Sequence, residues 1–206
     1  MRVEVVKASI SFGAHAVFTD LSATFLPGSV TALAGPSGSG KSSLLAAVAA
    51  HQPLSGGRIE LHRSLGVVTP PTPGVAVWVP QGSNALARRT VLDNVLIGPL
   101  SAGRSRQMAE DLAVAALYQV GLIDRMREQA RRLSGGELQR VALARAIASE
   151  KPLILADEPS ANLDALNTAR VADLLSCLVT SATVVVATHD PLLIAAADHT
   201  VELRRL

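Results

Sequence analysis

The fold of this chain is decided by the stretch Gly35-Pro36-Ser37-Gly38-Ser39-Gly40-Lys41-Ser42. The stretch fits the pattern G-x-x-x-x-G-K-[ST], and it lies between an apolar run at 30–34 and an apolar, Ala-rich segment at 43–50. The run before it is typical of a buried strand and the segment after it of a helix, which is the order found in phosphate-binding loops. The sequence therefore predicts that this protein binds a nucleoside triphosphate.

The chemistry of this loop comes from its backbone and from two side chains. Glycines let the main chain pass close to an anion, and the helix N-terminus that follows adds partial positive charge. Lys41 can reach the β- and γ-phosphates, and the Ser42 hydroxyl can bind Mg²⁺. We expect ATP and Mg²⁺ as cofactors, with the nucleotide held by Gly35, Pro36, Ser37, Gly38, Ser39, Gly40, Lys41, Ser42 and Ser43.

The composition points to one globular domain with an aliphatic core. The chain has 206 residues, of which 49% are hydrophobic and only 2% are aromatic. The formal net charge is +2, and the arginines are spread along the chain without interleaved aromatic residues. This pattern indicates a solvated charged surface, so we expect no nucleic-acid partner.

The cysteine content and the lengths of the apolar segments indicate the cellular location of the protein. Cys177 is the single cysteine, which allows no intrachain disulfide and suits a reducing compartment. The N-terminus alternates like a strand and does not resemble a signal peptide, and no apolar run approaches 18 residues. We expect a soluble, cytoplasmic protein.

The order of patterns along the chain predicts an α/β core interrupted by a helical insert. Strand patterns occur at 2–10, 16–26, 58–61, 75–79, 153–157 and 183–187, and the run at 75–79 reads as a strand covered on both faces. Residues 83–150 have helical spacing, with Met108, Leu112, Ala115 and Ala116 expected on one helix face. Val171, Leu174, Leu175 and Leu178 mark a later amphipathic helix.

Two carboxylates follow the apolar run 153–156. Strand C-termini in open α/β sheets line the ligand crevice, so Asp157 is expected beside Ser42, where it would bind Mg²⁺. Glu158 would point toward the γ-phosphate and accept a proton from the attacking water. We therefore predict Asp157 as a metal ligand and Glu158 as the catalytic base.

A second anion-binding helix start is predicted at Leu133-Ser134-Gly135-Gly136-Glu137. Ser134 can cap this helix, and the two glycines leave its first amides bare. The string resembles the signature motif of the ATP-binding cassette (ABC) ATPases, and further motifs of that family follow in order across the whole chain. Glu137 departs from the family's commonest glutamine.

The resemblance implies the fold and further site residues. It implies a P-loop NTPase core with a mixed sheet, flanking helices and an antiparallel β subdomain at 1–82 and 151–206, with an inserted α-helical signature subdomain at 83–150. Gln81 matches the Q-loop glutamine, a metal and catalytic residue, and His189 the switch histidine. Asp164 lies in the D-loop, and Phe12 matches the aromatic that stacks on adenine, where tyrosine is commoner.

The resemblance also implies partners. Two nucleotide-binding domains of this family pair head to tail, so Ser134, Gly135 and Gly136 would contact the nucleotide of a second copy. We expect the ATPase subunit of an ABC transporter, held at the inner face of the membrane by separate permease subunits. Val91, Leu92 and Val95 are the expected contacts to the permease. The alternatives are an ABC ATPase of DNA repair or translation, and a regulatory ATPase acting on a membrane partner.

Overall fold

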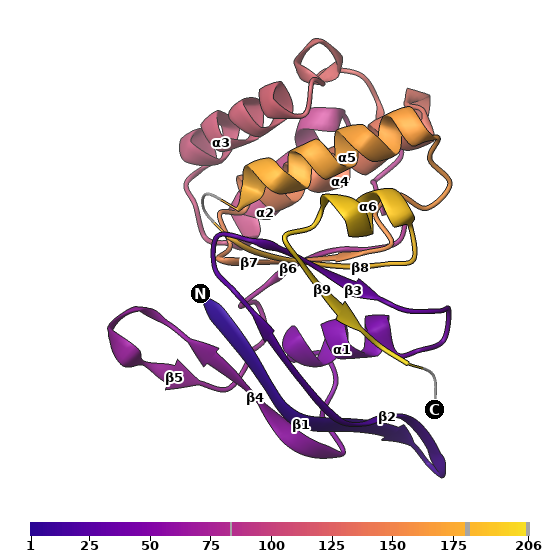
Figure 1. Cartoon of the computed structure of the whole chain (residues 1–206). Helices are drawn as coiled ribbons and strands as arrows, with labels where there is room; N and C mark the ends of the chain where they lie inside the picture. Colours follow the sequence, from indigo (N-terminus) through magenta and orange to yellow (C-terminus); the bar gives the residue numbers. More distant parts are fainter. Residues whose placement is uncertain (83, 180–181, 205–206) are drawn as a thin grey trace.

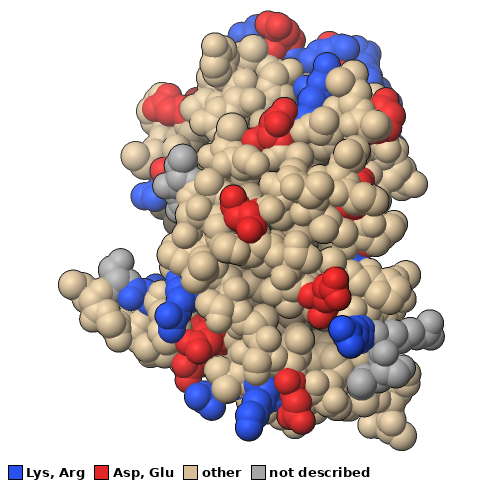
Figure 2. All heavy atoms as spheres, viewed as in Figure 1, with Lys and Arg blue, Asp and Glu red and all other residues tan. Residues whose placement is uncertain are grey.

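The computed structural model describes residues 1–82, 84–179 and 182–204. Its strands form two separate sheets, and its helices pack against and between them (Figure 1). On the face shown in Figure 2, Lys and Arg side chains are scattered among Asp and Glu, which gives this face a mixed charge.

The larger sheet is parallel and supplies the strand that leads into the phosphate-binding loop. Its strand order is β6-β7-β8-β3-β9. The strands are β3 (Val30–Ala34), β6 (Val77–Val79), β7 (Leu153–Asp157), β8 (Thr183–Thr188) and β9 (His199–Glu202). All residues of β3 and β8 are buried, as expected of parallel strands covered on both faces.

The smaller sheet is antiparallel, with the strand order β2-β1-β4-β5. Its strands are β1 (Arg2–Phe12), β2 (His15–Phe25), β4 (Gly56–His62) and β5 (Val68–Thr69). Helix α1 (Lys41–Val48) packs between the two sheets, because Leu44 and Leu45 share one hydrophobic core with Val3 and Ile59 of the small sheet and Leu155 of the large one. The loop before α1 is therefore fixed by both sheets.

The remaining helices cover the other face of the parallel sheet and form a helical layer beyond it (Figure 1). They are α2 (Val91–Ser101), α3 (Arg106–Gln119), α4 (Gly135–Ala148), α5 (Ala165–Leu178) and α6 (Pro191–Ala196), with 3-10 turns at Ser64–Gly66, Ile123–Arg125 and Ala130–Arg132. Helix α4 contributes to two cores, with Leu143 against the sheet and Val141 against α2 and α3. The predicted fold class is confirmed. The exact division into subdomains stays a prediction, and its boundary residue 83 lies outside the described residues.

The predicted strand at 75–79 is shorter and more exposed than expected. Val75 donates its N–H to the carbonyl of Thr72 at 3.1 Å in a turn, so β6 begins only at Val77. This strand lies at the edge of the sheet, and Val77 and Trp78 are only partly buried. An edge position leaves one side of a strand without a neighbour, which the run of apolar residues did not reveal.

The four residues expected on one face of α3 lie only partly on its packed side, where Ala116 is buried and Leu112 is partly buried against the core. The buried residues of this helix are Ala109, Ala113, Ala116 and Leu117, whereas Met108 is 49% exposed and Ala115 is exposed. Both sets of residues fit the helical period. The alanine face is the one that packs against α2 and α4, because small side chains let the helices approach closely.

The expected permease contacts Val91 and Val95 are also wrong. Both are 0% exposed and pack in the core that α2 shares with α3 and α4, so no partner can reach them. Leu92 is partly buried. The apolar side chains exposed in and just before α2 are instead Leu86, Ile97 and Leu100, at 51%, 39% and 41%.

Candidate functional site

The phosphate-binding loop connects the buried strand β3 of the parallel sheet to α1, and two of its glycines cannot be replaced. A Cβ atom at Gly35, where φ is +153°, would lie 2.4 Å from the carbonyl oxygen of Leu203. A Cβ atom at Gly40, where φ is +93°, would lie 2.6 Å from Cγ1 of Val17 and 2.8 Å from the Phe18 ring. The glycines thus serve both the backbone conformation and the close packing of the loop against β2.

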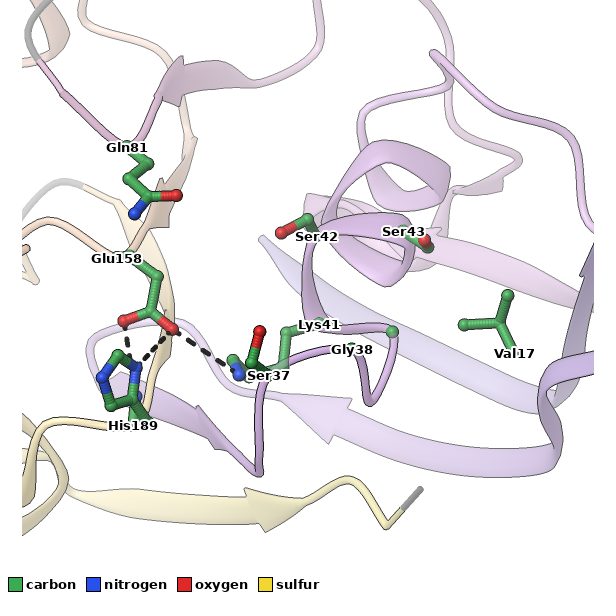
Figure 3. A pocket seen from close by; sticks show the side chains of 10 residues that line it. Val17, Ser37, Gly38, Lys41, Ser42, Ser43, Gln81, Glu158 and His189 are labelled. Carbon is green, nitrogen blue, oxygen red and sulfur yellow. Dashed lines mark hydrogen bonds and ion pairs between the residues drawn. The ribbon is translucent and has the colours of Figure 1, made fainter. Parts of the chain in front are cut away.

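The loop forms one wall of a cavity of about 370 Å³. The lining residues are Val17, Ser37, Gly38, Gly40, Lys41, Ser42, Ser43, Gln81, Glu158 and His189. Figure 3 shows Gln81, Glu158 and His189 on one side of the loop and Val17 on the other. Most of the predicted cofactor-binding and catalytic residues therefore meet at one place, although they come from distant parts of the chain.

Lys41 lies at the base of this cavity with its side chain only 6% exposed. Its Nζ atom donates to the carbonyl oxygens of Gly35 at 2.7 Å and Pro36 at 3.2 Å, and it lies 3.5 Å from Oε1 of Glu158. The ammonium group is thus held in place by the loop itself. A fixed, poorly hydrated cation at a helix start suits a phosphate ligand.

Ser42 and Asp157 form a pair of oxygen donors beside the lysine. The Ser42 hydroxyl donates to Oδ1 of Asp157 at 2.9 Å. Burial raises the pKa of Asp157, the hydrogen bond from Ser42 opposes this, and the charge of Glu158 adds to the increase. A hydroxyl and a carboxylate are hard oxygen ligands of the kind that Mg²⁺ prefers, so the residues present fit this ion.

Glu158 turns out of strand β7 into the cavity through a strained backbone. Its φ of +46° lies in the left-handed region, and its N–H donates to the Ala187 carbonyl at 2.8 Å, which holds this conformation. The carboxylate, 13% exposed, meets Nδ1 of His189 at 2.9 Å. Strained residues of this kind gather at functional sites because the strain aims a side chain.

Ser134 and the two glycines after it begin α4 but do not line the cavity. Ser134 accepts a hydrogen bond from the N–H of Glu137 at 3.3 Å, and Oε2 of Glu137 accepts one from the N–H of Ser134 at 2.8 Å. This reciprocal capping box holds the helix start open to solvent, with Ser134 and Gly135 exposed. The hydrogen bond from the Ser134 backbone holds the pKa of Glu137 below its ordinary value.

Asp164 lies close to this helix start rather than to the cavity. It caps α5, since its side chain accepts from the Asn167 N–H at 2.8 Å. A Cβ atom at Gly136 would lie 3.1 Å from the side chain of Asn167. The first turns of α4 and α5 therefore touch, which brings Asp164 and Gly136 onto the same part of the surface.

Four further predicted nucleotide-binding residues lie outside the cavity lining. Phe12 ends β1 and is 56% exposed, Ser39 is fully buried, and Gly35 and Pro36 contribute their carbonyl oxygens to Lys41. Val17, which sequence reasoning missed, does line the cavity. No local pattern marks Val17, because only the pairing of β1 with β2 carries it to the loop.

Comparisons with known proteins match this architecture. The family model described as ABC transporter matches residues 18–161. The chain is 36% identical over 195 residues to the arginine transport ATP-binding protein ArtM of Bacillus subtilis, which covers 91% of this chain and 81% of ArtM. It is 37% identical over 203 residues to an uncharacterized ABC transporter ATP-binding protein of Mycobacterium tuberculosis, covering 94% of this chain but only 61% of that relative's length.

A solved structure is similar over nearly the whole chain. It is a dimeric, post-hydrolysis state of the ATP-binding cassette MJ0796 bound to ADP and Pi. The sequences are 25% identical, the TM-score is 0.82, and the match covers 98% of this chain and 96% of that one. Within the described ranges 1–82, 84–179 and 182–204, no helix combines the length and apolar character needed to cross a membrane.

Proposed function

Because the chain belongs to the ABC transporter family and is the ATP-hydrolysing subunit of a transporter, we propose that two copies pair head to tail to hydrolyse Mg·ATP. The main support for this pairing is the different placement of two helix starts. The chain has two helix starts suited to phosphate, but only the loop before α1 lines the cavity, whereas Ser134 and Gly135 face solvent. In a head-to-tail pair, the second helix start of one copy would close the cavity of the other. The dimeric state of the MJ0796 cassette supports this arrangement.

In the proposed site, the loop from Gly35 to Ser43 holds the nucleotide, and Lys41 neutralises its β- and γ-phosphates. Ser42, Asp157 and Gln81 would hold Mg²⁺, which neutralises phosphate charge when bound. The hydrogen bond of 2.9 Å between Ser42 and Asp157 supports this assignment, because it places the two oxygens side by side. Phe12, at the exposed end of β1, would cover the adenine.

Glu158 is the proposed general base. Its carboxylate lies within reach of the loop and is oriented by the ring of His189 at 2.9 Å and by Lys41 at 3.5 Å. A base must be held at a defined place to accept a proton from water in the transition state. His189, whose side chain is 70% exposed, is free to contact a γ-phosphate while it keeps Glu158 in position.

Across the proposed dimer, the Ser134 hydroxyl and the first amides of α4 would bind the γ-phosphate held by the other copy. Asp164 lies on the same surface through its contact with Asn167, so it would face the same interface. The capping box supports this role, since it keeps the helix start ordered without covering Gly135 and Gly136.

The membrane partner is proposed to be a separate permease, which would place the protein at the inner face of the cell membrane. ArtM is a transport ATP-binding protein, and this chain resembles it over most of its length. The exposed apolar side chains Leu86 and Ile97 are the proposed contacts, in place of the buried Val91 and Val95.

The dimer is tested by ATP hydrolysis at increasing protein concentration. If the composite site forms between two copies, the activity per molecule rises with concentration and then levels off, whereas a site complete in one copy gives a constant value. A constant value down to dilutions at which sedimentation shows only monomer contradicts the proposal. Purification from solubilised membranes tests the permease, which should copurify with the wild type and less with Ile97→Asp.

A further inference from the structure

Strands β1 and β4 place three potential metal ligands together on the outward face of the antiparallel sheet. Inward positions such as Val3 and Leu61 are buried, and the alternate positions point away from the core. Glu4 lies directly opposite Glu60 in the pairing of the two strands. His62 lies two residues beyond Glu60 and therefore on the same face.

Two carboxylates directly opposite each other on neighbouring strands repel, so this arrangement favours a cation between them. Each glutamate has an arginine on its own strand, with Arg2 donating to Glu4 at 2.8 Å and Arg58 to Glu60 at 2.7 Å. These arginine side chains are 44% and 64% exposed, so water screens their charge. Arg58 binds Oε1 of Glu60, whereas His62 faces Oε2 of the same carboxylate.

The ring of His62 faces both carboxylates. Its Nε2 atom lies 3.0 Å from Oε2 of Glu4 and 3.5 Å from Oε2 of Glu60. The atom itself has almost no accessible surface, although the side chain as a whole is 26% exposed, and it meets the two carboxylates at ion-pair distances. A ring nitrogen shielded from water that faces two carboxylates at this range marks a position where a shared cation would satisfy all three groups.

We propose that Glu4, Glu60 and His62 bind a zinc-like divalent metal ion, with water completing the coordination. One ligand atom from each residue lies within 4.8 Å of the others, so small side-chain rotations bring all three to the 2.0–2.2 Å that is typical of zinc ligands. The imidazole favours zinc over Mg²⁺ or Ca²⁺, which prefer oxygen ligands alone. Arg2 and Arg58 would act as the outer partners that orient the ligating carboxylates.

This ion would link β1 to β4 and stiffen the antiparallel sheet. None of its three ligands lines the cavity beside the phosphate-binding loop, so the site is separate from the proposed ATP chemistry. A failure of the proposed ATP chemistry would therefore leave the proposed metal site unaffected, and the reverse also holds.

Calorimetric titration with ZnCl₂ alone tests the site. The wild-type protein should bind one zinc ion at this site, and His62→Ala and Glu60→Gln should each weaken that binding about 10-fold or more. The matched controls His199→Ala and Glu150→Gln remove an exposed histidine and a carboxylate elsewhere and should bind zinc as the wild type does. Zinc should also raise the unfolding temperature of the wild type but not of His62→Ala.

Circular dichroism establishes that each variant is folded before titration. Absorption of bound Co²⁺ offers a second measurement, because ligation by His62 gives a visible band that His62→Ala loses. The proposal is overturned if the wild type binds no zinc up to about millimolar concentration, or if His62→Ala and Glu60→Gln bind it with unchanged affinity.

Discussion

Nδ1 of His189 lies 2.9 Å from Oε1 of Glu158, at the carboxyl ends of the neighbouring strands β8 and β7 (Figure 3). The same carboxylate oxygen lies 3.5 Å from Nζ of Lys41. Carboxyl ends of parallel strands meet at one edge of a sheet, so residues far apart in sequence converge there. The carboxylate is thus held between the imidazole ring of His189 and the ammonium group of Lys41.

The first prediction concerns Glu158 as the base. Glu158→Gln keeps the size of the side chain but cannot accept a proton, so ATP hydrolysis should fall about 10²- to 10⁴-fold while ATP binding persists. Steady-state phosphate release and calorimetry measure the two effects. Glu150→Gln, an exposed carboxylate paired with Arg104, is the control and should leave both unchanged. If Glu158→Gln hydrolyses ATP at a rate within a few-fold of the wild type, a residue other than Glu158 is the general base.

The second prediction is that Glu158→Gln accumulates as a closed dimer when Mg·ATP is present. Hydrolysis is the step that would open the pair, so blocking it should trap both copies around the nucleotide. Light scattering after size-exclusion chromatography measures the mass with Mg·ATP and with Mg·ADP. A dimer with ATP alone agrees with the head-to-tail arrangement, and monomer under both conditions counts against it.

The third prediction concerns Lys41 and the phosphates. Hydrogen bonds to charged groups contribute about 1.5–3 kcal/mol, so Lys41→Ala should lower ATP affinity about 10- to 100-fold. Lys151→Ala is the matched control, because Lys151 also donates to a backbone carbonyl, that of Gly74 at 2.7 Å, but lies outside the cavity. An unchanged ATP affinity in Lys41→Ala would show that this loop does not bind the nucleotide.

The fourth prediction separates the two helix starts. Gly136→Asp should bind ATP normally as a dilute monomer but fail to dimerise or hydrolyse it, because its charge would face the γ-phosphate of the partner. The added Cβ atom would also press on Asn167 at 3.1 Å. Ala115→Asp, which adds the same charge to the exposed face of α3, is the control. Loss of ATP affinity in the Gly136→Asp monomer would mean that α4 contacts nucleotide within its own chain.

The fifth prediction uses the pKa of Glu137. The backbone hydrogen bond from Ser134 lowers this pKa below the ordinary 4.5, so the charged carboxylate stabilises the fold above pH 4.5. That stability is lost as the pH falls through the lowered pKa. A negative charge in the first turn of a helix contributes about 0.3–1 kcal/mol, so Glu137→Gln should be less stable by about that amount at pH 7.

Urea unfolding of wild type and Glu137→Gln, measured at pH 7 and at successively lower pH, gives this difference. The two proteins should differ at neutral pH and converge as the pH falls through the lowered pKa of Glu137. Glu110→Gln, which removes an exposed ion pair with Arg106, is the control and should show a smaller change. A difference that persists in acid would show that charge is not the cause.

The sequence by itself determined the phosphate-binding loop, the carboxylates after β7 and the cap of α4. These features depend on residues that are neighbours in the chain. The glycines at fixed spacing before Lys41 imply a phosphate-binding loop, and the apolar run that ends in Asp157 implies a buried strand. Ser134, three residues before Glu137, implies a capped helix start. The fold class followed from the same signals, because strand and helix patterns alternate around them.

Only the tertiary structure decided which side chains share a surface. Val17 reaches the loop through strand pairing, Val91 is covered by two helices, and β6 is exposed because the sheet ends there. The pairing of Glu4 with Glu60 depends on the register of β1 against β4 in the same way. Burial and proximity depend on the elements that come to lie opposite a residue. A periodic pattern in one segment carries no information about its neighbours in space.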